Sequence, residues 1–222
     1  MRLVRASYEI LTDLAGLPKI IERAGRCCYK SEEKIQDGTA DPFCEMLIRR
    51  GHESVIEHAN MMAKFTIDRG VSHELVRHRL CSFSQESTRY CDYAPGGKAA
   101  GIVFVIPPWV DIEPGDYIYY DCSGMGIAHC ASDSSWYHAM IEAESAYNSL
   151  RANGWKPEQA RSVLPNSLKT EIIVTANLRE WRHIQRLRTA EAAHPQMREV
   201  MQPLFAELHA KLPAIFPQEP AK

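Results

Sequence analysis

The pattern of apolar and polar positions along the chain switches between two periods. Apolar residues that recur three and four positions apart predict helices, whereas alternating and β-branched runs predict strands. Helices are predicted at residues 18–26, 42–50, 71–79, 136–153, 157–163, 177–187 and 195–212. Strands are predicted at residues 3–11, 61–67, 101–106 and 171–176. The pattern therefore predicts a mixed protein in which strands and helices follow one another along the chain.

The order of these elements indicates the class of fold. Strands are interleaved with helices, but few strand–helix–strand units are present, and such units are what build parallel sheets. We therefore predict an α+β fold with a largely antiparallel central sheet flanked by helices. The 222 residues fit a single domain, residues 1–222. Residues 109–133 are rich in Gly, Asp and Ser, and predict a connecting loop or a lid.

Composition and charge narrow the classes of function. The formal net charge is -2 and the pI is near 6.5, whereas proteins that bind nucleic acid or anionic membranes in bulk carry a clear basic excess. No apolar run approaches the roughly 18 residues of a membrane span, and residues 1–10 contain no apolar signal region. The seven cysteines include an adjacent pair, Cys27 and Cys28, which predicts reduced thiols and a cytoplasmic protein.

Against this near-neutral background, residues 77–90 (RHRLCSFSQESTRY) concentrate arginines and hydroxyls. If residues 71–80 form a helix, Arg79 falls in the middle of its apolar side. A buried guanidinium is costly unless a carboxylate, a phosphate or backbone carbonyls accept its hydrogen bonds. The alternative is an arginine whose charged end reaches solvent because the helix stops one residue early.

The helix predicted from residue 177 onwards repeats this arrangement. Arg188 projects between Trp181 and Ile184 on its apolar side, and Arg161 precedes Pro165 on a short helix. An anion supplied from outside the chain would satisfy all these arginines, although unrelated ion pairs remain an alternative. The opposite face is predicted to be solvated and carries Arg179, Arg182, His183 and Arg186.

Other site chemistries fit the sequence less well. The histidines of HELVRH (73–78) are five positions apart and those of HESVIEH (52–58) six, so neither pair shares a helix face as zinc ligands do. Cys122, His129 and Cys130 lack an evident fourth ligand, and we predict no metal site. Arginines near Cys81 would lower the pKa of its thiol. Neither a GxGxxG nor a GxxxxGK[ST] motif is present, so side chains and loop amides must hold any nucleotide.

The stretch Arg77-His78-Arg79, seven further residues and then Ser87 resembles the signature of the flavin-dependent thymidylate synthases. GHESVIEH (51–58) resembles the histidine-rich turn of that family, and residues 160–188 resemble its C-terminal half. Together these blocks span most of residues 50–200. Residues 109–133 match no part of the family pattern.

The resemblance implies a reaction, cofactors and an assembly. The family methylates dUMP reductively to dTMP, with methylene-tetrahydrofolate as carbon donor and FAD reduced by NADPH as hydride donor. It also implies a homotetramer with sites formed where subunits meet, and a protein that needs neither membrane nor nucleic acid. Arg188 is expected to be the catalytic residue that stabilises the uracil ring as N3 loses its proton.

The resemblance also implies two sets of binding residues. The set expected at the FAD site is Ser54, Arg77, His78, Arg79, Gln85, Asn177, Leu178, Arg179 and His183. The set expected around dUMP is Glu74, Arg77, Gln85, Glu86, Ser87, Thr88, Arg89, Arg161 and Arg188. Ser87 is then a ligand rather than a nucleophile, and Cys81 a packing residue. The alternatives are a non-catalytic nucleotide- or RNA-binding protein, and a metallohydrolase that uses His52, His58, His73 or His78.

Overall fold

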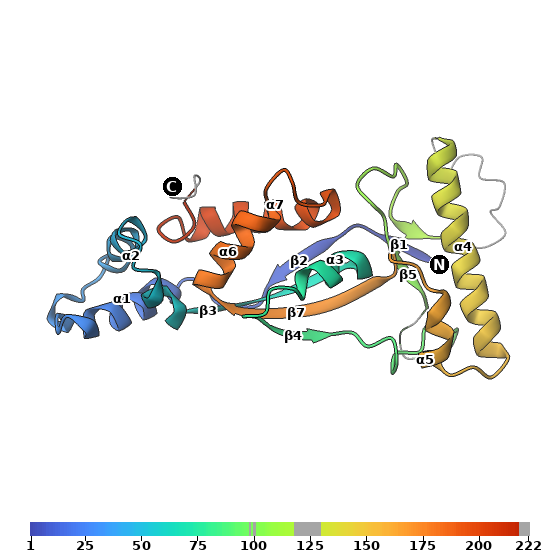
Figure 1. The fold of residues 1–222 in the computed structure, drawn as a ribbon, viewed down its shortest axis with the longest axis horizontal. Helices are drawn as coiled ribbons and strands as arrows, with labels where there is room; N and C mark the ends of the chain where they lie inside the picture. The colour runs from blue at the N-terminus through green and yellow to red at the C-terminus, as the bar shows by residue number, and fades with distance from the viewer. Residues whose placement is uncertain (98, 100, 118–129, 218–222) are drawn as a thin grey trace. The chain divides into compact units, whose positions relative to one another are not determined.

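The computed structural model describes residues 1–97, 99, 101–117 and 130–217 (Figure 1). The chain divides into two compact units. Unit 1 consists of Met1–Ser7, Phe65–Arg77 and Ser84–Ile172, and unit 2 of Tyr8–Lys64, His78–Phe83 and Ile173–Lys222. Whether these two units act as the single domain predicted for residues 1–222 is not tested by this division, so that assignment stays a prediction.

Unit 1 is built on a short three-stranded sheet. Its order is β5 (Val103–Val105), β1 (Arg2–Val4) and β6 (Gly115–Asp116), with β1 parallel to β5 and antiparallel to β6. The helices of this unit are α3 (Arg69–Leu75), α4 (Ala131–Ala152), α5 (Pro157–Ala160) and the 3-10 turn η3 (Arg161–Val163).

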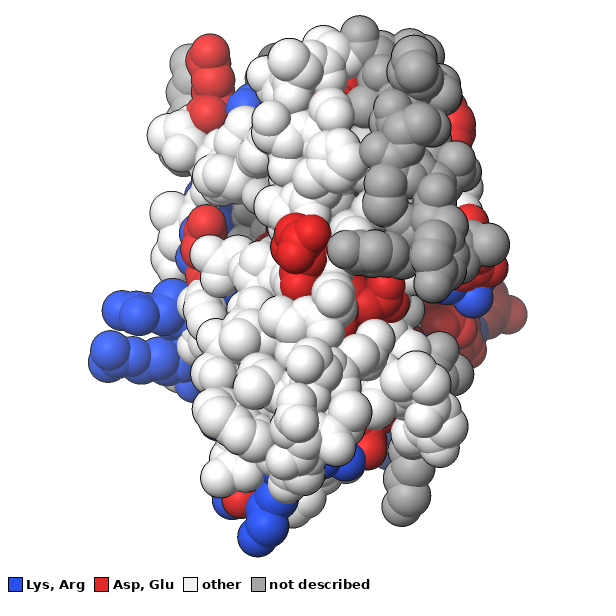
Figure 2. Space-filling view, turned by 90° about the vertical axis from the view of Figure 1, so that its right-hand side faces the viewer, with Lys and Arg blue, Asp and Glu red and all other residues white. Residues whose placement is uncertain are grey.

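The core of unit 1 joins this sheet to α4. Leu3 and Phe104 are paired across β1 and β5, and both are fully buried together with Tyr137, Ile141 and Tyr147 of α4. The tyrosines lie on the side of α4 that faces the core. The exposed side of α4 carries several small residues: Ser135, Ala139, Ser145 and Ser149. Figure 2 shows few charged side chains on the face of unit 1 where α4 lies.

Unit 2 is mainly helical. Its elements are β2 (Ser7–Ile10), α1 (Leu17–Cys28), η1 (Glu32–Lys34), α2 (Ala40–Arg49), η2 (Glu53–His58), α6 (Leu178–Arg188) and α7 (Pro195–Lys211). Helix α1 packs on α2 and η2, and α6 packs on η2 and α7. Trp181 of α6 is fully buried, and its Nε1 donates to the carbonyl of Met61 at 3.0 Å. These contacts fix the start of α6, from which several candidate site residues project.

Strands β3 (Asn60–Asp68), β4 (Ser82–Gln85) and β7 (Lys169–Asn177) have residues in both units, as does β2, whose first residue, Ser7, is assigned to unit 1. With β2 they form a sheet of order β2-β3-β7-β4. Alternate residues of β3 and β7 are buried, as strict alternation between the faces of a sheet requires. The predicted α+β class with a largely antiparallel sheet is confirmed, and the β1–β5 pair is a parallel exception.

The structure corrects three of the predicted elements. The strand predicted at 3–11 is two strands, β1 and β2, which belong to different sheets. Strand β4 and turn η2 were not predicted, because short segments carry too little periodicity. Of the predicted loop at 109–133, the described parts include β6 and the first turn of α4, and residues 118–129 lie outside the described residues.

The third correction concerns the helix predicted at residues 71–79, which leads into the arginine-rich stretch 77–90. Helix α3 ends at Leu75 and is capped by Val76, so it stops before Arg79. Arg79 is exposed, and the prediction that it projects into the apolar side of a helix is wrong. The rule of 100° per residue fails there because the helical backbone ends four residues before the predicted end.

Within the part of the chain that the structure describes, no helix has the length and apolar character needed to cross a membrane. Among the described residues, the cysteines, including Cys27, Cys28, Cys44 and Cys81, form no disulfide, and their redox state stays a prediction.

Gly25 allows the close approach of α1 to its neighbours. A Cβ at this position would lie 2.5 Å from Cε1 of Phe43 and 3.3 Å from Cγ1 of Val55. We expect Gly25→Ala to lower the free energy of unfolding by about 1–3 kcal/mol because the Phe43 ring must move. Urea denaturation would measure this. Gly16→Ala is the control, since nothing lies within 4 Å of a Cβ there, and an equal loss in both variants would contradict the packing argument.

Candidate active site

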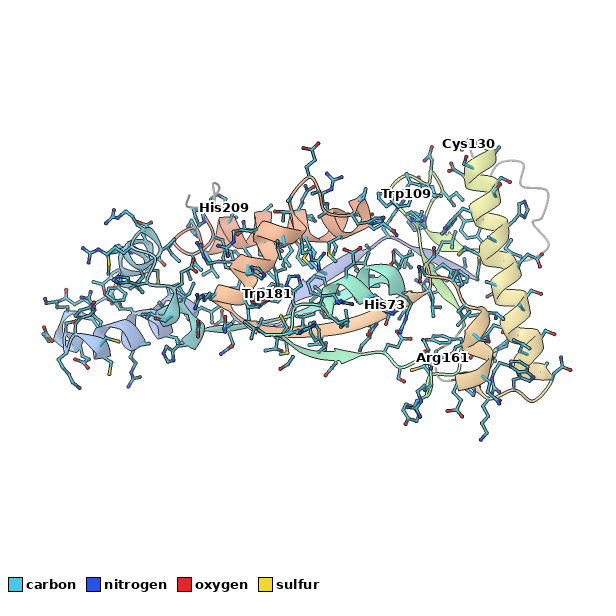
Figure 3. All side chains as sticks on the ribbon, viewed as in Figure 1. His73, Trp109, Cys130, Arg161, Trp181 and His209 are labelled. Carbon is cyan, nitrogen blue, oxygen red and sulfur yellow. The ribbon has the colours of Figure 1, made fainter. Side chains whose placement is uncertain are left out.

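A cavity of about 240 Å³ in unit 1 is lined by cationic and hydroxyl groups. Arg69 opens α3, and His73 follows four residues later on the same face of that helix. Arg161 opens η3, and its Nη1 donates to Oγ1 of Thr88 at 2.9 Å (Figure 3 labels His73 and Arg161). The full lining among the described residues is Arg69, His73, Thr88, Arg161, Ser162, Leu164, Pro165, Asn166 and Leu168.

This lining contains no carboxylate among the described residues. Arg69 is half-buried, and its backbone N–H donates to the carbonyls of Asn166 and Leu168, which places the start of α3 against the loop after η3. Two guanidinium groups that converge without an acidic partner attract an anion, and planar guanidinium groups match phosphate oxygens well. The volume is several times the roughly 30 Å³ of one water molecule. The cavity is therefore suited to a phosphate group.

The sequence analysis placed Arg161 and Thr88 in the dUMP set, and the structure brings them into contact. It missed Arg69 and His73. The available signal was their spacing of four residues, which places both side chains on the face of α3 that meets Arg161. That signal was hidden because HELVRH was considered only as a possible zinc motif.

Two other members of the predicted dUMP set hold β4 and the following loop in place. Gln85 donates from Nε2 to Oγ of Ser72 at 3.0 Å and to Oγ1 of Thr170 at 3.2 Å. The carboxylate of Glu86 accepts from the Tyr93 hydroxyl at 2.8 Å and from Nζ of Lys169 at 2.8 Å. Burial, and next the Glu86 carboxylate, raise the pKa of the Tyr93 hydroxyl. These side chains are engaged within unit 1, and the backbone N–H of Glu86 also donates to the carbonyl of Glu171, so both residues hold β4 and the following loop against β7.

Four further members of the predicted dUMP set also belong to unit 1: Ser87, Arg89, Glu74 and Arg77. Ser87 accepts at Oγ from the backbone N–H of Arg89 at 3.3 Å. Arg89 is exposed, with Nε 4.0 Å from a Glu158 carboxylate oxygen and its guanidinium 5.4 Å from the Tyr90 ring centroid. Glu74 is half-buried and Arg77 exposed at the end of α3. None of these lines the cavity, so the structure gathers only part of the predicted set there.

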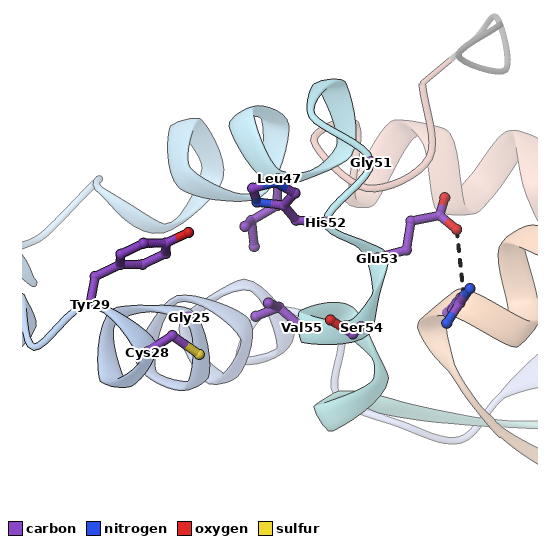
Figure 4. A pocket seen from close by; sticks show the side chains of 10 residues that line it. Gly25, Cys28, Tyr29, Leu47, Gly51, His52, Glu53, Ser54 and Val55 are labelled. Atoms are coloured by element: carbon purple, nitrogen blue, oxygen red, sulfur yellow. Dashed lines mark ion pairs between the residues drawn. The ribbon is translucent and has the colours of Figure 1, made fainter.

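Unit 2 contains a second cavity, of about 480 Å³, where α1, α2, η2 and α6 meet (Figure 4). Gly51, at φ +70, makes the turn that carries the chain from α2 into the segment 52–58. Two residues predicted for the FAD site, Ser54 and Arg179, line this cavity. The full lining is Gly25, Cys28, Tyr29, Leu47, Gly51, His52, Glu53, Ser54, Val55 and Arg179.

Arg179 is held by two glutamates. Its Nη1 donates to Glu57 at 2.6 Å, and its Nε lies 3.5 Å from Glu53 (Figure 4). These contacts raise the pKa of Arg179, with the Glu57 hydrogen bond as the main cause. The guanidinium, the Ser54 hydroxyl and the His52 imidazole form a donor set that suits the polar parts of a dinucleotide, and the volume is within the usual range of ligand cavities. Because Glu53 and Glu57 offset the charge of Arg179, this cavity offers a ligand hydrogen-bond donors rather than an uncompensated cation.

Two further members of the predicted FAD set, Asn177 and Leu178, have most of their polar groups engaged within the protein. Asn177 caps α6, with its Oδ1 accepting from the backbone N–H of Glu180 at 2.9 Å. Leu178 is fully buried, and its N–H donates to the carbonyl of Ala59. The Leu178 side chain and N–H are therefore both engaged within the protein.

Arg182 corrects the predicted solvated face of α6. It is buried, donates from Nη1 to the carbonyl of Ile215 and pairs with Glu53 at 3.5 Å. Burial lowers the pKa of Arg182, while Glu53 acts in the opposite direction. The prediction failed because α7 and residues 212–216 cover that side of α6. Arg182 holds the C-terminal segment and is not a ligand residue.

A third cluster, His78, Glu180, His183 and Arg188, lies within unit 2. Nδ1 of His78 is 3.3 Å from Oε1 of Glu180, and Nε of Arg188 donates to Nε2 of His78 at 2.9 Å. The His183 ring meets the His78 ring edge-on, with centroids 5.8 Å apart. Burial, and next the Arg188 charge, lower the pKa of His78. Arg188 therefore contacts a neutral imidazole, which the sequence analysis did not predict.

Comparison with solved structures shows a shared fold. A UMP/dUMP methylase from Streptomyces cacaoi, PolB, bound with 5-Br dUMP, superposes with a TM-score of 0.73 at 24% sequence identity. The superposition covers 97% of this chain and 95% of the other. The fold is thus one that also occurs in a nucleotide methylase.

Sequence comparison gives the family. The family model described as "Thymidylate synthase complementing protein" matches residues 9–214. The flavin-dependent thymidylate synthase of Mycobacteroides abscessus is 33% identical over 215 residues, which cover 92% of this chain and 80% of that protein. That of Mycobacterium tuberculosis is 35% identical over 210 residues, with the same coverage. The chain belongs to the family of flavin-dependent thymidylate synthases.

Proposed function

We propose that this protein is a methyltransferase that converts dUMP to dTMP, with methylene-tetrahydrofolate as carbon donor, FAD as flavin and NADPH as its reductant. The observation that carries the proposal is the cationic cavity of unit 1, which contains Arg161 and Thr88, in a chain of this family. The family assignment favours this enzyme over a non-catalytic nucleotide- or RNA-binding protein.

The phosphate of dUMP binds in the unit 1 cavity. Arg161 and Arg69 supply the positive charge, and the Thr88 and Ser162 hydroxyls donate further hydrogen bonds. Arg161 already reaches Thr88, so the two groups are oriented together before the ligand arrives. Arg89, exposed one residue further on, adds a cation at the edge of this site.

The uracil ring is activated by charge. A guanidinium placed beside N3 favours the ring anion, which makes C5 nucleophilic. Arg188 has this role. C5 attacks the methylene carbon and loses its own proton, and the carbon becomes a methyl group when it receives a hydride and is released from tetrahydrofolate. Cys81 is not needed for this route, and burial raises the pKa of its thiol to about 12, which keeps it protonated at neutral pH.

FAD, once reduced, supplies the hydride when bound. The residues proposed to hold it are Ser54, Arg77, His78, Arg79, Gln85, Asn177, Leu178, Arg179 and His183. Ser54 and Arg179 do so from the unit 2 cavity.

We further propose a homotetramer and a cytoplasmic location. The weakly charged outer face of α4 supports assembly, because the cores of protein interfaces are depleted in charged residues (Figure 2). The free thiols support a reducing compartment. Light scattering on the purified protein would test the tetramer, and a monomer at micromolar concentration would contradict it.

The function is tested by measuring dTMP formation from dUMP and methylene-tetrahydrofolate, with FAD and NADPH each present or omitted. Product that requires both flavin and reductant supports the proposal. Product without any reductant would point to a route that uses a cysteine. The absence of product under all conditions would contradict the proposed reaction.

Arg89 offers a test of the substrate site that leaves the flavin site alone. We expect Arg89→Ala to raise the Kd of dUMP by about 10- to 100-fold, as loss of one charge-assisted hydrogen bond does, while the yellow colour is retained. Calorimetry would measure the Kd. Arg23→Ala is the control, because Arg23 is an exposed arginine of α1 outside both cavities. A Kd equal to wild type would contradict the placement of Arg89.

A further inference from the structure

The cluster of His78, Glu180 and Arg188 has only one consistent arrangement of hydrogen atoms. A guanidinium group can donate hydrogen bonds but cannot accept them. Because Nε of Arg188 donates to Nε2 of His78, that ring nitrogen must carry a lone pair. The proton of the neutral imidazole is then on Nδ1, from which it is donated to Oε1 of Glu180. The three side chains form a directed chain from arginine to histidine to carboxylate.

The burial of these hydrogen-bonded side chains indicates that Glu180 has a role beyond stability. His78 and Glu180 are each 5% exposed. Within the described part of the chain, the one hydrogen bond of the Glu180 carboxylate is to His78. A buried carboxylate is costly unless it is well partnered. Stability alone gives little reason for a glutamate at this position, since an apolar residue of similar size would avoid the cost.

The position of Glu180 in its helix leads to the same conclusion. Glu180 is the third residue of α6, after the Asn177 cap, and a glutamate there commonly turns back to the backbone N–H of the capping residue. Here the Asn177 side chain caps the Glu180 N–H, while the Glu180 carboxylate turns to His78. The side chain is therefore directed to the imidazole rather than used to cap the helix.

Carboxylate–histidine pairs in enzymes hold the imidazole in one tautomer and one orientation. In this protein Nε2 faces a guanidinium, so the imidazole acts as an acceptor and not as a base. We propose that Glu180 is a positioning residue: it fixes the Nδ1–H tautomer of His78, which in turn holds Arg188 by its Nε for contact with the pyrimidine ring of the substrate. This inference rests on the proposed function for the role of Arg188 only.

The same side chains allow a competing interpretation. Ligand atoms of His78, Glu180 and His183 lie within 4.8 Å of one another, so their spacing alone could suit a metal ion. The Arg188 guanidinium disfavours this, because it brings a positive charge to the cluster and uses Nε2 of His78. Metal analysis of the purified protein distinguishes the two interpretations.

The experiment compares Glu180→Ala and Glu180→Gln with wild type, and Glu207→Ala serves as control. Glu207 is a unit 2 glutamate that accepts from Tyr8 and Lys211. We expect Glu180→Ala to lower the turnover per bound flavin by about 10- to 100-fold, as loss of an outer partner commonly does, with the KM for dUMP unchanged. Glu180→Gln should recover most of the activity because its amide oxygen still accepts from Nδ1–H. Glu207→Ala should match wild type.

Three results would overturn the inference. One is wild-type kcat in Glu180→Ala. Another is a loss of activity in Glu180→Ala that the loss of flavin accounts for in full, with wild-type turnover per bound flavin, which would indicate that Glu180 does not act through Arg188. The third is a stoichiometric metal ion that disappears in Glu180→Ala and His183→Ala.

The tautomer can be measured without any turnover. Ring nitrogen NMR of protein labelled with ¹⁵N-histidine, assigned with His78→Asn, should show His78 protonated at Nδ1 and not at Nε2. Protonation at Nε2 would overturn the inference whatever the activity. If the tautomer is as expected but wild type forms no dTMP, the proposed function fails while the hydrogen-bonded chain stands, so the two failures are distinguishable.

Discussion

Arg188→Ala is expected to lower kcat for dTMP formation by about 10²–10³-fold, the usual cost of removing one group that stabilises developing charge. Flavin content should remain at the wild-type level, because the residues that line the unit 2 cavity are untouched. The physical reason is that the uracil anion loses its neighbouring cation, so C5 becomes a poor nucleophile. Steady-state kinetics and the flavin absorbance of the purified variant would measure both quantities.

Two further variants sharpen this test. Arg186→Ala removes an exposed arginine two residues earlier on α6 and should leave kcat unchanged. Arg188→Lys retains the charge but lacks the Nε–H that contacts His78, so it should recover only part of the activity. Normal turnover in Arg188→Ala would remove this residue from the mechanism.

Arg161→Ala is expected to raise the Kd of dUMP by about 100-fold or more while FAD is retained. The substitution removes one of two arginines in a cavity whose described lining contains no acid, and it leaves the Thr88 hydroxyl without its donor. A hydrogen bond to a charged group contributes about 1.5–3 kcal/mol, and a phosphate can engage both ends of one guanidinium. Calorimetric titration with dUMP would give the Kd.

The nature of the ligand can be checked with the same variant. Deoxyuridine lacks the phosphate, so its weak binding should be nearly the same in wild type and in Arg161→Ala. Arg161→Lys should be intermediate for dUMP, because an ammonium group offers charge without the planar fork. If dUMP binds to Arg161→Ala as it binds to wild type, the phosphate does not occupy the unit 1 cavity.

The sequence predicted the fold class because amphipathic period is a local property. Helices α1, α2, α6 and α7 begin and end within two residues of their predicted limits, since signals such as the Asn177 cap and a proline at the first helical position, Pro195, mark where they start. The end of α3 was missed, because nothing in residues 76–79 interrupts the apolar period although the backbone leaves the helix after Leu75. Arg79 was misplaced as a result.

The candidate site was less predictable from sequence periodicity than the fold, because its contacts join residues far apart in the sequence. Arg161 and Thr88 meet across 73 positions of sequence, and only the resemblance to a family placed them together. Glu180 was missed because its partner, His78, lies 102 positions away, and a single glutamate on a helix indicates nothing by itself. Arg182 was misjudged because the segment that buries it comes later in the chain and has no periodic relation to α6.

The division of the chain has a consequence for its evolution and engineering. The chain crosses between units after residues 7, 64, 77, 83 and 172, and two of these crossings fall inside the RHRLCSFSQESTRY stretch. Each unit is therefore assembled from three separate pieces of chain, and no single cut releases either one. A recombination point between residues 69 and 168 would divide the linings of both cavities at once. Chimaeras of this family with a crossover in this range are thus expected to exchange parts of both cavities together, and neither cavity can be exchanged alone there.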